Sequence, residues 1–273
     1  MLELTQDGHI ATLTIQRAEK KNAFTTAMWA QLLAACQQLL TEHAAGGGNA
    51  PRVLLLKGSG GVFCAGADIE EMSALRLDVA ALADNNHTVS QAQQALAALP
   101  LPTIAVIEGP CFGGGFGLAA ACDFRLASSG SQFAITPARL GLLYSIEDTR
   151  RVLALLGDSR TRRLLLRSER LDAATALAWG AVDTVVPSAE LASTAQAWAS
   201  SLATQSPTSM AGIKATLALL GNAEGKTNGG NTTEASVRSA FNAAFIGPDF
   251  AEGATAFLAK RAPRFQAYQA PPG

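Results

Sequence analysis

Two apolar stretches of the chain each run into a glycine-rich segment that precedes an expected helix. The stretch 103–107 (TIAVI) continues into 108–117 (EGPCFGGGFG), and the stretch 52–57 (RVLLLK) continues into 58–72 (GSGGVFCAGADIEEM). Glycine leaves main-chain N–H groups open to a ligand, and the first turn of a helix adds a partial positive charge. Two such turns can each supply one donor to the same oxygen, which is the construction of an oxyanion hole.

Glycine-rich turns also have uses other than an oxyanion hole. Glycines also permit tight packing of a strand against a helix. Segment 115–120 (GFGLAA) fits the loosened dinucleotide fingerprint G-x-G-x-x-A, which requires an acidic residue about 20 positions further on. Residues 128–130 (SSG) occupy that region, and the chain has no G-x-x-x-x-G-K-[ST] segment. Nucleotide phosphates are therefore rejected as the target.

The residues of both turns resemble one known family. Segment 63–69 (FCAGADI), together with Gly113, Gly114 and Gly115, is similar to the crotonase superfamily, the enoyl-CoA hydratase/isomerase group. This resemblance implies that the N–H groups of Ala67 and Gly114 hold the thioester oxygen of an acyl-CoA.

The resemblance runs from about Leu2 to Phe265 and also implies a fold. That fold is α/β, the ClpP-like crotonase spiral of repeated ββα units. It implies a core domain at 1–200 and a C-terminal helical region at 201–273, which builds a homotrimer or a dimer of trimers. The alternation of strands and helices along the chain independently favours α/β layering.

The resemblance places further substrate contacts along the chain. Loop 17–24 is similar to the family's R-P-x-x-x-N-A pattern, although Ala18 stands where the family usually has proline. Taken without the resemblance, this loop is only a solvated polar segment, and Asp68 is suited to the start of a helix. The implied substrate-binding residues are Ala23, Ala65, Asp68, Ile69, Gly113 and Lys260, the last near the CoA phosphates and sometimes across a subunit boundary.

The chain departs from the family where hydratases carry their acids. Hydration needs a positioned acid/base pair, which family hydratases supply with two glutamates. Gly117 and Ala138 stand at those positions, and Ser145 stands where many isomerases carry an acid. Ordinary hydration is therefore disfavoured, unless an acid from elsewhere replaces them. The candidates for that replacement are Glu70, Glu71, Glu147 and Asp148.

Tyr144 is the third candidate catalytic residue, beside Ala67 and Gly114. Segment 133–144 (FAITPARLGLLY) resembles the methylmalonyl-CoA decarboxylase-like branch, in which a tyrosine at this place enters the active site. That branch has a histidine where Ala67 stands, so the match is partial. A packing tyrosine with a satisfied hydroxyl is the alternative interpretation. For Glu147 and Asp148, helix capping is the alternative to catalysis.

Three functions remain open at this point. We expect an enzyme of the family, a lyase or isomerase, that acts through a stabilised thioester enolate. The second is an acyl-CoA decarboxylase or lyase that uses Tyr144, and the third is a non-catalytic acyl-CoA-binding protein. The only cofactor expected is coenzyme A as part of the substrate, and the acyl chain is not fixed by the sequence.

Composition limits the partners. The formal net charge of −1 and the pI near 6.3 give no reason to expect nucleic acid or an anionic membrane. Only 16% of the 273 residues are charged, which indicates surface hidden in subunit contacts. No apolar run approaches the roughly 18 residues that span a membrane, and segment 1–7 is unlike a signal peptide, so we expect a cytoplasmic protein.

The cysteines and histidines indicate no metal site. The four cysteines have no CxxC spacing and lie among apolar residues, which favours buried thiols over ligands or disulfides. The three histidines are scattered, so neither a Ser-His-Asp nor a Cys-His site is supported. The cysteines are Cys36, Cys64, Cys111 and Cys122, and the histidines are His9, His43 and His87.

Overall fold

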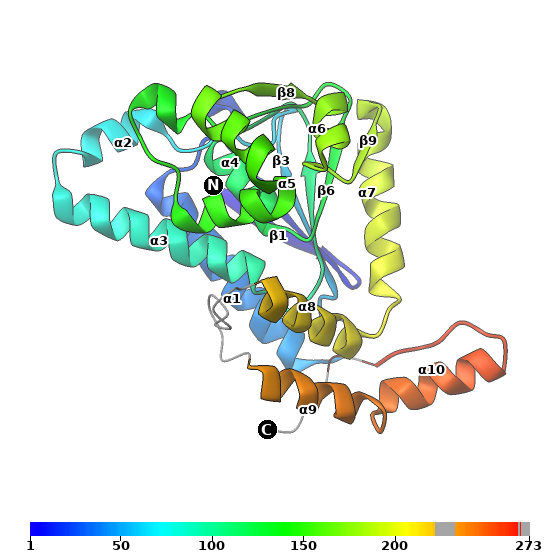
Figure 1. Ribbon diagram of the computed structural model, residues 1–273. Helices are drawn as coiled ribbons and strands as arrows, with labels where there is room; N and C mark the ends of the chain where they lie inside the picture. The colour runs from blue at the N-terminus through cyan, green and yellow to red at the C-terminus, as the bar shows by residue number, and fades with distance from the viewer. Residues whose placement is uncertain (222–232, 267, 269–273) are drawn as a thin grey trace.

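The computed structural model describes residues 1–221, 233–266 and 268 and contains a six-stranded sheet in the order β1-β2-β3-β4-β6-β9 (Figure 1). The β1 and β2 strands form an antiparallel pair, and every other pairing in this sheet is parallel. The strands are β1 (Leu2–Asp7), β2 (Ile10–Ile15), β3 (Val53–Gly58), β4 (Thr103–Ile107), β6 (Phe124–Ser128) and β9 (Thr184–Val186).

A second sheet of three short strands lies beside the first, in the order β5-β7-β8. Its strands are β5 (Pro110–Phe112), β7 (Gln132–Ala134) and β8 (Arg170–Asp172). The β5 and β7 strands run parallel and β8 pairs antiparallel with β7. Strands of three residues are too short to show a period of two, which leaves this sheet poorly marked in the sequence.

Helices cover both faces of the large sheet. Within the described residues they are α1 (Thr26–Ala45), α2 (Ile69–Leu75), α3 (Val79–Ala97), α4 (Gly114–Ala121), α5 (Ile146–Arg167), α6 (Ala173–Trp179), α7 (Ser188–Ala203), α8 (Pro207–Gly221), α9 (Glu234–Ala244) and α10 (Pro248–Leu258), with 3-10 turns η1 (Ala18–Lys20) and η2 (Pro137–Leu140).

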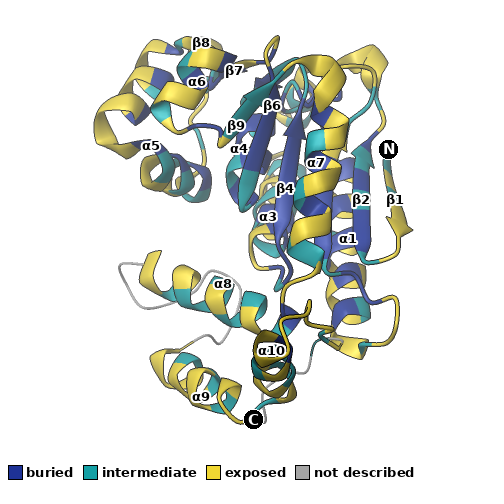
Figure 2. Ribbon diagram, turned by 90° about the vertical axis from the view of Figure 1, so that its right-hand side faces the viewer, coloured by how far each residue is buried: buried dark blue, intermediate teal, exposed yellow. Residues whose placement is uncertain are grey.

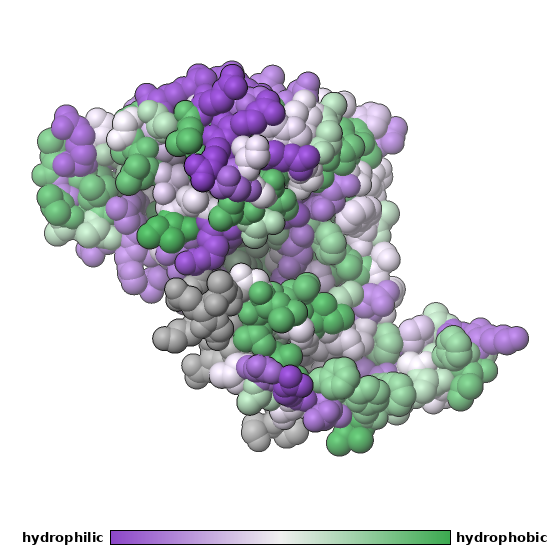
Figure 3. Space-filling view, viewed as in Figure 1, coloured by the Kyte–Doolittle hydropathy of each residue, from purple (hydrophilic) through white to green (hydrophobic). Residues whose placement is uncertain are grey.

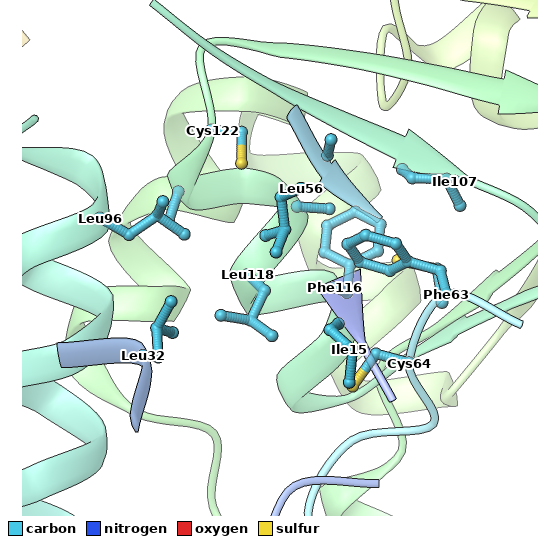
Figure 4. Packing of buried hydrophobic residues seen from close by; sticks show 14 of the residues in the cluster. Ile15, Leu32, Leu56, Phe63, Cys64, Leu96, Ile107, Phe116, Leu118 and Cys122 are labelled. Atoms are coloured by element: carbon cyan, nitrogen blue, oxygen red, sulfur yellow. The ribbon is translucent and has the colours of Figure 1, made fainter. Parts of the chain in front are cut away.

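The β3 strand explains why the sheet needs helices on both sides. Successive side chains of a strand point to opposite faces. Leu54 and Leu56 belong to the main core with α1, α3 and α4, whereas Val53 and Leu55 pack in a second cluster with α7. Figure 2 shows α7 lying across the buried strands, and Figure 4 shows the main core, in which Leu96 of α3 and Leu118 of α4 lie near Leu56.

The C-terminal helices α8, α9 and α10 lie at one end of the large sheet in both ribbon views (Figures 1 and 2). The Lys214 ammonium of α8 contacts the Asp123 carboxylate and donates to the Leu101 carbonyl oxygen at 3.1 Å. The Arg52 guanidinium donates to the Phe265 carbonyl oxygen at 2.8 Å. These contacts fasten the helical region to the core, and the division of domains at residue 200 stays a prediction.

Several local expectations are corrected by the structure. The helix after the glycine turn begins at Gly114 rather than at Leu118, since packing overrides the low helix propensity of glycine. Ser145, not Asp148, caps α5: its hydroxyl accepts from the Asp148 N–H at 3.0 Å. Of the predicted loop at 221–231, residues 222–231 lie outside the described residues.

No helix in the described ranges has both the length and the apolar character that crossing a membrane requires.

Candidate active site

The two glycine-rich turns meet in the structure. Residues 64–67 lie between the loop that ends at Phe24 and the β5 strand. On one side, the Phe24 N–H donates to the Gly66 carbonyl and the Asp68 N–H donates to the Phe24 carbonyl, each at 2.8 Å. On the other side, Cys64 and Cys111 form an isolated parallel bridge.

Glycine is required at two positions where these segments touch. Gly66 has a φ of +101°, and a Cβ there would lie 2.9 Å from the Phe112 carbonyl oxygen. A Cβ at Gly115 would lie 2.4 Å from the Cys64 carbonyl oxygen. Any larger residue would therefore separate the start of α4 from the segment that carries Ala67.

The N–H groups of Ala67 and Gly114 are neighbours at this contact. A methyl group added at Gly114 would lie 3.8 Å from the Ala67 nitrogen. Ala67 and Phe24 form an isolated parallel bridge, whose hydrogen bonds use the Gly66 carbonyl and the Asp68 N–H on either side of Ala67. The N–H of Ala67 itself therefore points away from loop 17–24. Neither N–H donates a hydrogen bond within the described part of the chain. The arrangement brings together two donors that have no partner there.

The helix dipole adds to these donors. Gly114 is the first residue of α4, and the Gly113 N–H before it donates to the Ala134 carbonyl at 2.8 Å, which fixes the turn to β7. The N-terminus of a helix carries a partial positive charge. The site therefore favours an oxygen that becomes negative.

Trp29 of α1 forms a wall of the site that the sequence did not reveal. Its ring would lie 3.6 Å from a Cβ at Gly114, and it packs on Phe24 with a centroid separation of 4.4 Å. In the sequence it directly follows Met28. A tryptophan that packs in the core and one that lines a site give the same sequence pattern in a helix.

The predicted binding residues fall into two groups. Ala23 and Ala65 lie next to the donors, half-buried, and Ile69 is exposed at the start of α2. Gly113 directly precedes the donor Gly114. Lys260 follows α10, at the end of the molecule where the C-terminal helices lie (Figure 1). The single chain therefore does not bring Lys260 together with Ala67 and Gly114.

Asp68 has structural partners at the edge of the site. Its carboxylate accepts from the Glu71 N–H at 3.1 Å, as expected for the cap of α2, and pairs with the Arg17 guanidinium at 2.7 Å. The Glu71 N–H and Arg17 together hold the pKa of the Asp68 carboxyl below its ordinary value. Asp68 thus links loop 17–24 to α2.

The Tyr144 hydroxyl reaches the same turn. It donates to the Gly113 carbonyl oxygen at 3.1 Å, one residue from the donor Gly114. Burial raises the pKa of this phenol well above its ordinary value, and the nearby Asp148 carboxylate adds to the shift. Tyr144 therefore stays protonated at neutral pH and can act as a hydrogen-bond donor.

The Asp148 side chain occupies the space beside Gly117. Residue 117 is the position at which family hydratases carry a glutamate. A Cβ at Gly117 would lie 2.7 Å from the Asp148 Oδ2 atom. The carboxylate is buried, accepts from Gln93 Nε2 at 3.1 Å and pairs with Arg151 at 3.1 Å. Burial raises the pKa of the Asp148 carboxyl, and Arg151 and Gln93 oppose that shift.

The other candidate acids lie in different surroundings. Glu70 pairs with Lys20 at 3.0 Å, and the Glu71 Oε2 atom accepts from the Thr26 N–H at 2.8 Å. Ala138 is exposed on η2. Among the four candidate acids, Asp148 is therefore the one whose carboxyl group lies against Gly117, a position at which family hydratases have a glutamate. Gln93 was missed in the sequence because a single polar residue in a helix carries no signal of its partner.

The four cysteines are buried free thiols, as predicted. Burial raises the pKa of Cys36, Cys64 and Cys122 to about 12 and raises that of Cys111 as well. Thiolate nucleophiles are therefore scarce near neutral pH.

Comparison with known proteins agrees with this geometry. A family model described as "Enoyl-CoA hydratase/isomerase" matches residues 5–268. A Mycobacterium tuberculosis protein named "Probable enoyl-CoA hydratase echA6" is 31% identical over 268 residues, which cover 97% of this chain and 99% of that protein. The enoyl-CoA isomerase/hydratase fer4 of Mycosarcoma maydis is 31% identical over 228 residues, 81% of this chain and 80% of that protein.

Solved structures show the same similarity. The crystal structure of an enoyl-CoA hydratase/carnithine racemase from Magnetospirillum magneticum superposes with a TM-score of 0.88 at 29% identity. The match covers 98% of this chain and 96% of that chain. An enoyl-CoA hydratase from Bacillus anthracis superposes with a TM-score of 0.86 at 25% identity, over 98% of this chain and 99% of that one.

Proposed function

The chain belongs to the enoyl-CoA hydratase/isomerase family, with the crotonase fold, and from this premise we propose that it stabilises the enolate of an acyl-CoA thioester. The observation that carries the proposal is the pair of N–H groups of Ala67 and Gly114, which lie side by side without partners in the described residues. Coenzyme A enters as part of the substrate.

The mechanism follows from where charge develops. When a proton or a carboxylate group leaves the α-carbon, the electron pair moves into the thioester and negative charge builds on its oxygen. Two preorganised N–H donors stabilise that oxygen more in the transition state than in the substrate. The dipole of α4 contributes in the same direction, because Gly114 is its first residue.

We favour isomerase or lyase chemistry over hydration. Hydration requires two groups that handle protons, and Gly117 and Ala138 stand where family hydratases carry their glutamates. An isomerase moves one proton between carbons of the same substrate and can operate with a single acid/base group.

Decarboxylation is a second candidate because of Tyr144. Loss of CO₂ forms the enolate directly, and the Tyr144 hydroxyl bonded to Gly113 lies within one residue of the donor Gly114. If Tyr144 protonates the enolate or orients the leaving carboxylate, Tyr144→Phe lowers turnover of a malonyl-type ester by about 10²-fold or more while ester binding persists. Undiminished turnover in the folded variant would assign Tyr144 a packing role.

The test of the proposed function uses a panel of CoA esters in heavy water. Enoyl, methylmalonyl, malonyl and saturated acyl esters are incubated with the pure protein and followed by mass spectrometry. We expect deuterium at the α-carbon, a shifted double bond or loss of CO₂. Binding of the esters without any chemical change would support the non-catalytic acyl-CoA-binding alternative.

A further inference from the structure

We propose that Asp148 is the catalytic acid/base of this site, supplying from α5 the carboxylate that Gly117 cannot carry on α4. The inference rests on the proposed enolate chemistry and names the group that moves its proton.

The position of the carboxylate is fixed by Gly117. A Cβ at residue 117 would lie 2.7 Å from Oδ2 and 2.8 Å from Oδ1 and Cγ of Asp148. The carboxyl group therefore fills the space in which a side chain at 117 would begin. Asp148 in this position therefore requires glycine at 117, because any residue with a Cβ at 117 would displace the acid.

This space lies on the side of α4 that carries the oxyanion donor. Residues three apart on a helix are neighbours, with Cβ positions about 5–6 Å apart, and side chains lean toward the N-terminus. Gly117 follows Gly114 by three residues, and the Cβ position of Gly114 is 3.8 Å from the Ala67 nitrogen. In this proposal, the α-carbon and β-carbon of a thioester whose oxygen is bound by Ala67 and Gly114 lie between these donors and Asp148.

The contacts of Asp148 keep it fixed yet leave it able to accept a proton. Gln93 Nε2 donates to Oδ2 and Arg151 donates to Oδ1, so the two oxygens are held from different helices. Arg151 keeps a buried charge tolerable, and burial favours the protonated form. Gln93 and Arg151 act as positioning residues for the carboxyl group.

The step balances with groups of this chain and the substrate. The Asp148 carboxylate takes the α-proton of the ester, the C–H electron pair forms the C=C bond of the enolate, and the carbonyl π pair moves to the oxygen held by Ala67 and Gly114. The protonated Asp148 then returns the proton to the α-carbon, or to the γ-carbon when the substrate is a 3-enoyl ester, whose double bond lies between the β- and γ-carbons. No oxidant, reductant or metal ion is consumed.

The first test compares Asp148→Asn with Glu147→Gln, which removes the carboxylate of the preceding residue in the chain. Deuterium uptake from heavy water is followed on the ester that the wild-type protein labels fastest, with ester binding and thermal unfolding measured in parallel. We expect Asp148→Asn to label about 10²–10⁴-fold more slowly with binding retained. Glu147→Gln should stay within a few-fold of wild type.

A second variant moves the acid back to α4. Asp148→Gly removes the carboxylate and opens its space, and Gly117→Glu added to it restores a carboxylate from the other helix. We expect the double variant to label at least tenfold faster than Asp148→Gly alone. This test can also be made if Asp148→Asn fails to fold. A folded double variant that labels no faster than Asp148→Gly would count against the inference.

The outcomes separate the two proposals. Undiminished labelling by folded Asp148→Asn overturns the role of Asp148 and leaves the oxyanion donors in place. A wild-type protein that binds the esters but neither labels nor converts any of them overturns both the role of Asp148 and the proposed enolate chemistry.

Discussion

Ala67 and Gly114 act through main-chain N–H groups, so substitutions that change only side chains test them poorly. What matters at these residues is the presence of the N–H and the close approach of two backbone segments. Gly66 and Gly115 allow that approach, because a Cβ at either would lie within 3 Å of a carbonyl oxygen on the facing segment. Variants that delete an N–H are therefore the informative ones.

Gly114→Pro removes one donor from the site. Proline is accepted at the first position of a helix, which Gly114 occupies, so the fold of α4 should persist. We expect turnover to fall by about 10²–10³-fold. The matched comparison is Gly114→Ala, which keeps the N–H and whose Cβ meets Trp29 only at 3.6 Å. Unchanged turnover in folded Gly114→Pro would refute the role of this donor.

At the scale of elements, the buried Asp68 carboxylate helps to hold α2 to the loop before α1. Asp68 caps α2 through the Glu71 N–H, and its pairing with Arg17 joins loop 17–24 to the same point. Two segments on which the resemblance places the CoA contacts are thereby coupled. The coupling depends on pH because it requires the ionised form of Asp68.

Asp68→Asn tests this coupling. The pKa of Asp68 is lowered in the folded protein, so its stabilising contribution is present above the ordinary pKa of 3.8 and is lost as the pH falls through the folded value. We expect the variant to unfold with about 1.5–3 kcal/mol less free energy at pH 7. Urea unfolding at pH 7 and at pH 3 should show this difference shrinking in acid. An equal difference at both values would exclude the ionised pair as its source.

At the scale of the molecule, the C-terminal helices expose a large apolar surface. Figure 3 shows apolar residues gathered over α8 and along α9 and α10. A monomer rarely leaves so many large apolar side chains in water. The exposed residues are Ile213, Leu217, Leu220, Phe241, Phe245, Ile246, Phe250, Phe257 and Leu258.

We propose that this surface forms the contact of the trimer, or of a dimer of trimers, that the family resemblance implies. Light scattering should give a mass three or six times the 28.2 kDa of one chain. Phe245→Asp, at the residue that follows α9, should lower that mass, whereas Ser239→Asp, which adds the same charge within α9, should not. A wild-type mass of one chain would exclude this assembly.

The predicted role of Lys260 also depends on the oligomeric state. This residue follows α10 and lies away from Ala67 and Gly114 in the single chain, so contact with the CoA phosphates requires a neighbouring subunit or a different placement of α10. Its binding role stays a prediction of the resemblance.

The sequence alone determined the family, the fold class and the two glycine turns. The β4 strand and the α2 cap at Asp68 were predicted because each depends on residues adjacent in the chain. Only the tertiary structure showed that the Asp148 carboxyl group fills the space beside Gly117. Gly117 on α4 and Asp148 on α5 form one site only because the two helices pack together. No local sequence pattern encodes that contact.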